Sequence, residues 1–290
     1  MFSYFWEKAY IRHFDGERLL VPAVHPNTDM EAFTTLGTIL VHGFMVCGFL
    51  PVRLAFPTIA YVLCGKEIGI SNQILLQSLA DYVPGHDCGI ICEAMEKGGD
   101  SFQPKIKTRL IDILSRLGCT EIPTPSNIRR LLISIAKYTF QGKPLGILLT
   151  MRSGVPVCYH SFWQQFNTDK LFRLYKALSA SPSSVLQSVS EPEFMNAAEE
   201  RVYHFLKTYI TNMREEEVRS FLRFVTGSAV LTSKSITVTF NNLSGMQRHP
   251  IAHTCDCVLE LSTSYTSYPE FEHEFSVLMP DEMSWTMDSI

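Results

Sequence analysis

The chain has 290 residues, of which 46% are hydrophobic and 19% carry a charge. This composition supplies enough apolar side chains for one large or two modest folded domains and excludes a disordered chain. The formal net charge is −4 and the sequence shows no cluster of lysine and arginine, so neither a nucleic acid nor an anionic membrane is an expected partner.

The N-terminal segment and the most apolar window argue against secretion and membrane insertion. Residues 1–20 carry scattered charges and lack a small-residue cleavage site, so a signal peptide is not expected. The window from Leu36 to Val52 contains His42 and Pro51 and ends next to Arg53, which favours a buried helix over a membrane span. We therefore expect a soluble cytoplasmic or nuclear protein whose eight cysteines are reduced, most of them as small core residues.

Apolar residues recur at helical spacing through the first two thirds of the chain. Gly118 is a candidate C-cap for one of these helices, because glycine readily adopts the left-handed conformation that ends a helix. The expected helices start after a capping box at residues 28–31, at Ser71, at residue 105, at Ser126 and at Thr168.

A serine- and proline-containing segment, residues 179–193, is predicted to be a linker or hinge between two domains. The pattern then changes to helices over residues 194–213 and 214–227, alternating strands in SITVTF and CVLELS, and a final helix in YPEFEHEFSVLM. This order predicts a compact α/β unit over residues 194–290 after a mainly helical part over residues 1–178. The expected fold class is therefore α+β.

The stretch RHPIAHTCDCVLELS, residues 248–262, contains the strongest chemical signal. Cys255 lies before a strand with His253 two residues upstream, a pattern that could serve a nucleophilic thiolate, a metal site or a disulfide. A disulfide is disfavoured in an intracellular protein. Structural zinc needs four ligands in paired clusters, and neither His253-Cys255-Cys257 nor His86-Cys88-Cys92 has a second cluster nearby, so no metal is expected. A cysteine hydrolase would also need an orienting Asn or Asp and an oxyanion hole.

Several motifs together resemble HECT ubiquitin ligases. FLRFVTGS at residues 221–228, a following strand, P-x-AHTC at residues 250–255 and a C-terminal helix with a late aromatic residue closely resemble the family's C-terminal lobe. The apolar helix and turn in LGTILVHGFMVCGFLPVRLAFP is similar to part of the N-terminal lobe. The C-terminal layout is most similar to divergent ligases of the G2/M phase-specific type. The resemblance covers nearly the whole chain and implies a bilobal fold with a truncated N-terminal lobe.

The resemblance implies a ubiquitin-protein ligase whose partners are ubiquitin, a conjugating enzyme and a protein substrate, with no cofactor. The family's catalytic cysteine falls on Cys255, and His253 and Thr254 fall on supporting positions. Trp285 lies roughly where the family has a phenylalanine used in ligation, and the hinge falls near residues 179–184. His253 could make a structural hydrogen bond, or it could act as a base or stabilise the thiolate. Thr254 could position the loop or an oxyanion.

Two departures from the family pattern leave an alternative open. Asp256 and Cys257 follow the nucleophile where many members have Phe-Asn. The carboxylate of Asp256 opposes a neighbouring thiolate by Coulomb repulsion, although it could accept a proton from an incoming lysine; Cys257 is expected to face the core. Residues 80–114, where the family docks the conjugating enzyme, are predicted to be helical and shortened. The alternative to an active ligase is therefore a catalytically inactive HECT-like scaffold.

Overall fold

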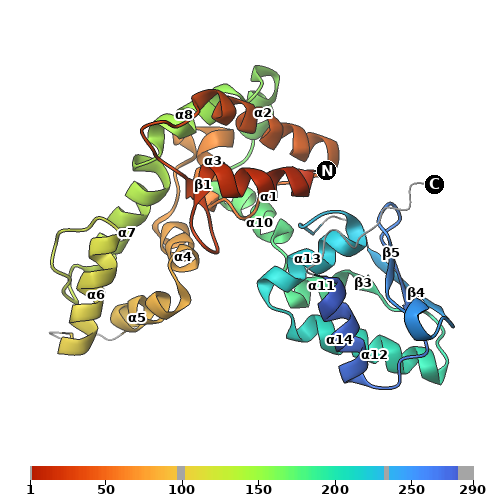
Figure 1. The fold of residues 1–290 in the computed structure, drawn as a ribbon. Helices are drawn as coiled ribbons and strands as arrows, with labels where there is room; N and C mark the ends of the chain where they lie inside the picture. Colours follow the sequence, from red (N-terminus) through yellow and green to blue (C-terminus); the bar gives the residue numbers. More distant parts are fainter. Residues whose placement is uncertain (1, 97–101, 232–234, 280–290) are drawn as a thin grey trace. The chain divides into compact units, whose positions relative to one another are not determined.

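The computed structural model describes residues 2–96, 102–231 and 235–279 (Figure 1). Internal contacts divide the chain into two compact units. The unit that we call helical comprises Trp6–Cys47 and Pro51–Tyr175. The C-terminal unit comprises Lys176–Ile290 together with two short pieces from earlier in the chain, Met1–Phe5 and Gly48–Leu50.

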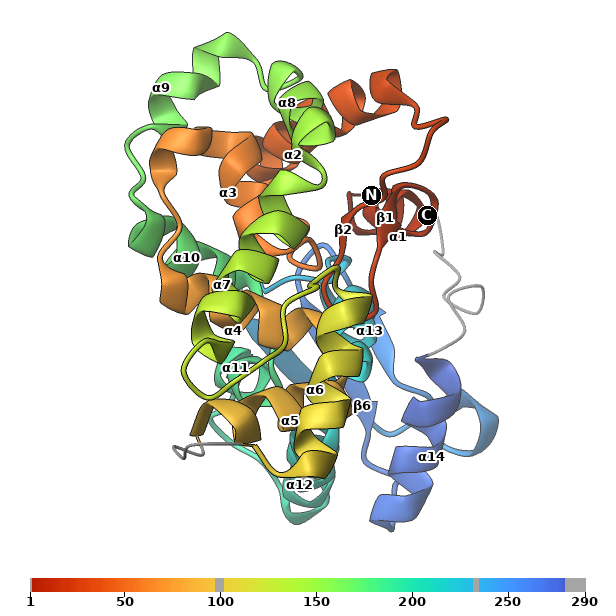
Figure 2. The same cartoon turned by 90° about the vertical axis from the view of Figure 1, so that its left-hand side faces the viewer.

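The described residues of the helical unit are mainly α-helical, as the sequence predicts for this part of the chain. The short antiparallel strand pair near its start is not predicted. Within it, α2, α3 and α8 gather at one end, and α5 and α6 lie at the other (Figures 1 and 2). Its main elements are α1 (Phe2–His13), β1 (Phe14–Asp15), β2 (Val21–Pro22), α2 (Met30–Cys47), α3 (Phe56–Cys64), α4 (Asn72–Tyr82), α5 (Gly85–Glu96), α6 (Pro104–Arg116), α7 (Ile128–Lys137), a π-helical turn (Tyr138–Gly142), α8 (Leu145–Ser153), α9 (His160–Trp163) and α10 (Thr168–Leu178). The residues of α1 and α10 are divided between the two units.

Helices α2 and α8 pack with their backbones in direct contact. A Cβ atom added to Gly37 of α2 would lie 1.8 Å from the Met151 carbonyl oxygen, and one added to Gly154 would lie 1.9 Å from the Thr34 carbonyl oxygen. The Thr38 hydroxyl donates a hydrogen bond of 2.7 Å to the Gly154 carbonyl. By length and composition α2 could also cross a membrane. About a third of the helix, 33%, is buried, including the glycine-bearing face that packs against α8, and the choice of a core helix over a membrane span stays a prediction.

A second core lies between α4, α5, α6 and α7. Leu79 of α4, Leu110 of α6 and Leu132 of α7 are at most 1% exposed and belong to one apolar cluster. Phe140, in the π-helical turn, is fully buried in the same cluster. The predicted helical character of residues 80–114 is therefore confirmed over α5 and α6.

The helix ends follow local capping chemistry, with two differences from the sequence prediction. Ser71 caps α4 as predicted, accepting a hydrogen bond of 3.3 Å from the Ile74 amide. The first long helix is capped by Asp29 instead of Thr28, because the Asp29 carboxylate accepts from the Ala32 amide. Helix α7 starts after Asn127, not at Ser126.

In its described residues, the C-terminal unit contains a mixed sheet of four strands and the helices α11 to α14. The strands lie in the order β3-β4-β6-β5; β3, β4 and β6 run parallel to one another, and β5 is antiparallel to β6. The α+β fold class is thus confirmed. The elements are α11 (Pro182–Ser188), β3 (Val189–Ser190), α12 (Ala197–Asn212), α13 (Glu215–Thr226), β4 (Ile236–Asn241), β5 (Ile251–His253), β6 (Val258–Ser262) and α14 (Tyr268–Leu278).

The core of this unit lies between the sheet and the helices. Phe271 and Phe275 of α14 are fully buried, with their ring centroids 4.6 Å apart, and Tyr209 of α12 lies 5.0 Å from Phe275. The strands contribute alternate residues to the same core, Ile236 and Val238 from β4 and Leu259 and Leu261 from β6.

Most of the segment predicted as a linker, residues 179–193, has regular structure. Ser181 and Ser184 form a capping box at the start of α11, with Pro182 at a position where a missing amide hydrogen costs nothing. Val185 is fully buried, and β3 pairs with β4. Serine and proline thus mark a helix start here. The division between the compact units falls slightly earlier, between Tyr175 and Lys176, and the hinge role of the segment stays a prediction.

Candidate active site at the β5–β6 hairpin

Cys255 lies in the tight turn that joins β5 to β6. The two strands pair antiparallel, with His253 opposite Val258, and the Asp256 amide donates a hydrogen bond of 3.2 Å to the His253 carbonyl. Residues 254–257 therefore form the tip of a β-hairpin. The sequence predicts Cys255 at the entrance to a strand but does not reveal β5, and so it misses the hairpin.

The two cysteines of the turn have opposite environments. Cys255 is exposed, whereas Cys257 is 2% exposed and its Sγ lies 3.9 Å from the Thr254 carbonyl oxygen. Cys257 faces the core as predicted, although it adopts a left-handed turn conformation with φ of 54° instead of an extended one. Of these two thiols, only that of Cys255 is open to a large reaction partner.

His253 belongs to a polar network on one face of the sheet. Alternation along the paired strands places His253 and Glu260 on the same face. The His253 Nε2 atom lies 3.4 Å from a Glu260 carboxylate oxygen, and the other oxygen accepts a 2.9 Å hydrogen bond from the Asn241 amide group. A hydrogen bond between these two atoms requires a proton on Nε2, because an ionised carboxylate only accepts hydrogen bonds. This contact orients an imidazole that is 55% exposed two residues before Cys255.

Thr254 brings the turn against the end of α13. Gly227 closes α13 in the left-handed conformation, with φ of 71°, and its amide donates to the Arg223 carbonyl. A Cβ atom added to Gly227 would lie 3.7 Å from the Cβ of Thr254. The FVTG and AHTC motifs, which are distant in sequence, therefore meet beside Cys255.

The conformation of Gly227 leads to a test of this junction. Gly227→Ala is expected to lower the free energy of unfolding by about 1 kcal/mol, because a Cβ atom strains the left-handed backbone. Space is not limiting, since a 3.7 Å contact is an ordinary van der Waals distance. Gly227→Asn should lower the free energy of unfolding by less than Gly227→Ala does, because asparagine tolerates the left-handed conformation better than alanine. Urea denaturation checks both variants, and equal stability of the alanine variant and the wild type would contradict the strain.

The family comparison places this hairpin in a known domain. A sequence model of the HECT domain (ubiquitin-transferase) matches residues 95–280, well over half of the chain. The chain belongs to the HECT-domain family. A comparison with curated proteins gives no match. The matched region of the HECT domain contains α6 to α14 and the whole β5–β6 hairpin. It starts after the helix and turn at residues 36–57, whose similarity to the N-terminal lobe stays a prediction.

The remaining predicted site residues of the HECT domain have different outcomes. Asp256 is exposed beside Cys255 in the turn. Trp285 lies outside the described residues. Within residues 2–96, 102–231 and 235–279, no group of three or more His, Cys, Asp or Glu side chains could hold a metal ion. The catalytic roles of His253, Thr254 and Asp256 stay predictions.

Sequence reasoning did not single out Glu260 or Asn241. Glu260 lies between the buried residues Leu259 and Leu261 of the inner strand β6. A carboxylate on an inner strand needs a partner, and this was the available signal. The partners, however, come from neighbouring strands whose register the sequence does not give.

Proposed function

We propose that this HECT domain accepts ubiquitin from a charged conjugating enzyme as a thioester on Cys255 and transfers it to a substrate lysine. The family match supports ubiquitin transfer as the general activity. The observation that most supports Cys255 as the acceptor is its exposure at a hairpin tip within the matched region. An exposed tip lets two large proteins approach one sulfur atom in succession.

The first step exchanges one thioester for another. The Cys255 thiolate attacks the carbonyl carbon at the end of ubiquitin, a new carbon–sulfur bond forms, and the thiolate of the conjugating enzyme leaves. Because the bond formed and the bond broken are of the same type, the free energy changes little. Ubiquitin is therefore not trapped on either protein.

The second step forms an amide bond and needs a proton acceptor. The uncharged lysine amine attacks the thioester carbonyl, the carbon–sulfur bond breaks, and Cys255 leaves as a thiolate while the amine loses a proton. The exposed carboxylate of Asp256 and the imidazole of His253 both lie near the turn and can accept a proton. We propose both as candidates for the proton transfer.

A single assay tests the proposal. The purified chain is mixed with charged conjugating enzymes and labelled ubiquitin, and the products are separated on a non-reducing gel. A ubiquitin adduct that disappears with a thiol reductant, and that prior alkylation of the chain prevents, is the expected result. If no adduct forms with a broad panel of conjugating enzymes, the proposal fails and the inactive scaffold is the better description.

A further inference from the structure

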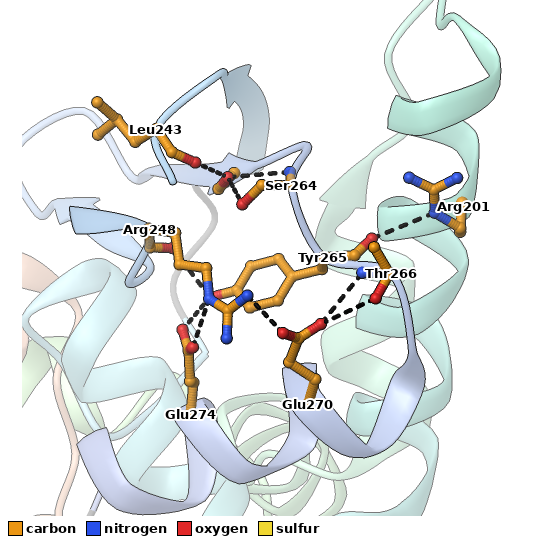
Figure 3. Close-up of polar contacts among 9 residues, drawn as sticks. Arg201, Leu243, Arg248, Ser264, Tyr265, Thr266, Glu270 and Glu274 are labelled. Carbon is orange, nitrogen blue, oxygen red and sulfur yellow. Dashed lines mark hydrogen bonds and ion pairs between the residues drawn. The ribbon is translucent and has the colours of Figure 1, made fainter. Parts of the chain in front are cut away.

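A cluster of charged and aromatic side chains holds the segment that leads into β5. Arg248 lies just before this strand, and its guanidinium group contacts two carboxylates of α14 (Figure 3). The Nε atom lies 2.6 Å from Glu274, and the Nη1 atom contacts Glu270. The Arg248 side chain is only 21% exposed. One arginine therefore bridges two successive turns of a helix.

Tyr265 contacts the main chain of Arg248 as well as its side chain. The tyrosine is fully buried, and its hydroxyl lies 2.9 Å from the Arg248 carbonyl oxygen and 2.6 Å from the Glu274 carboxylate. The guanidinium carbon lies 5.1 Å from the centre of the Tyr265 ring. Burial, together with the hydrogen bond to Glu274, raises the pKa of Tyr265, so the hydroxyl keeps its proton and remains a donor. The single hydroxyl proton is shared between the Arg248 carbonyl and the Glu274 carboxylate, so Tyr265 contacts both the main chain of Arg248 and one carboxylate partner of its side chain.

The strand that follows is short. β5 has only three residues and lies at one edge of the sheet, where β6 is its only partner strand among the described residues. β5 also packs against α13, and its His253 contacts Glu260 of β6. Short edge strands are the parts of a sheet that open most easily. The contacts at Arg248 therefore secure the one end of β5 that does not continue into the turn.

We propose that Arg248, held by Glu270, Glu274 and Tyr265, is a positioning residue that fixes the hairpin turn carrying Cys255. The inference rests on the proposed function, in which Cys255 accepts ubiquitin. Thioester exchange between two proteins requires the sulfur to meet a carbonyl carbon with the correct direction, and a displacement of about 1 Å can cost roughly 100-fold in rate. A loosened β5 leaves Cys255 exposed but no longer holds it in one place.

Partly buried ion pairs add little net stability but specify one geometry, which suits a positioning role. The planar guanidinium fork can contact both glutamates at once, whereas a lysine ammonium is a point charge on a flexible stem. Arg248→Lys should therefore keep part of the restraint on β5 and the turn. Arg248→Gln, which has no charge to pair with the glutamates, should lose this restraint.

The test compares these two variants with Lys207→Gln as a matched control. Lys207, on α12 in the same unit, also pairs with a glutamate and lies over a tyrosine ring, 4.4 Å from its centre. Three quantities are measured: the single-turnover rate of thioester formation, the rate of alkylation of the Cys255 peptide by iodoacetamide, and hydrogen exchange of the peptide containing β5.

In Arg248→Gln, we expect thioester formation to slow by at least about tenfold while alkylation changes by less than about twofold. Exchange of the β5 peptide should become about tenfold faster, with α12 unchanged. The rates of thioester formation and of β5 exchange in Arg248→Lys should lie between those of Arg248→Gln and the wild type. Both rates in Lys207→Gln should match those of the wild type. A general loss of folding would speed hydrogen exchange throughout the unit, whereas a loss of positioning speeds it only in β5. The Lys207→Gln control shows whether removing any charged partner in this unit has the same effect.

The proposal is overturned if Arg248→Gln forms the thioester at the wild-type rate, or if exchange rises equally in β5 and α12. Failure of the proposed function gives a different result, because the wild type itself would then form no thioester. In that case the exchange data still decide the positioning role: faster exchange confined to β5 supports it, and unchanged exchange overturns it.

Discussion

Replacing Cys255 by alanine is expected to abolish the thiol-labile ubiquitin adduct, with a loss in rate of at least about 10⁴-fold. Alanine removes the sulfur that we propose forms the bond, and Cys257, the nearest thiol in sequence, cannot replace it because it is buried with its Sγ against the Thr254 carbonyl. The rate is measured by single-turnover transfer from a charged conjugating enzyme.

Cys257→Ala is the matched control for this prediction. It removes a thiol two residues away and should keep the adduct, with a stability loss of about 1 kcal/mol from the smaller buried side chain and the left-handed backbone at this position. Adduct formation by the Cys255 variant at the wild-type rate would contradict our assignment. Loss of the adduct only in the Cys257 variant would do so as well.

The longer elements follow directly from the sequence. Residues 197–212 and 215–226 show apolar residues at helical spacing, and Gly227 stops the second helix because it adopts the left-handed conformation. The alternating pattern of residues 236–240 also suffices for β4, since each inward side chain enters the core. Where burial sets a regular period over several turns or residues, the pattern in the sequence determines the element.

The short elements depend on partners that the sequence does not reveal. β3 and β5 have two and three residues, too few to show a period, and they are strands only because β4 and β6 lie beside them. Helix α11 was missed for a different reason. Serine and proline favour both loops and helix starts, and the burial of Val185 against the core decides between these outcomes.

The same distinction, between what the sequence predicts and what only the fold reveals, applies to the candidate site. The proposed nucleophile, Cys255, can be found from its motif, because AHTC is contiguous in the chain. The residues that we propose hold it in place cannot be found in this way, because they meet only after folding: Arg248 is separated from Glu270 by 22 residues and from Glu274 by 26. The motif in the sequence therefore leads to the proposed nucleophile, and the fold adds the contacts that we propose hold it in position.

Replacing Phe275 by alanine is expected to lower the free energy of unfolding of the C-terminal unit by about 3–5 kcal/mol. The ring is fully buried, and its centroid lies within 6.5 Å of the rings of Phe271, Tyr209 and Phe221, so it joins α14 to α12 and α13. Truncation removes these contacts and leaves a cavity that the surrounding rigid rings can fill only in part. Guanidinium denaturation followed by circular dichroism measures the change.

Val277→Ala, two residues further along α14, separates burial from helix propensity. Val277 is 62% exposed, so its truncation should change stability by no more than about 0.5 kcal/mol, with alanine slightly favoured as the better helix former. Because α14 also supplies Glu270 and Glu274, loss of its anchoring ring should loosen the contacts at Arg248 and slow ubiquitin transfer. A Phe275 variant as stable as the Val277 variant would mean that the aromatic cluster is not what holds α14 in place.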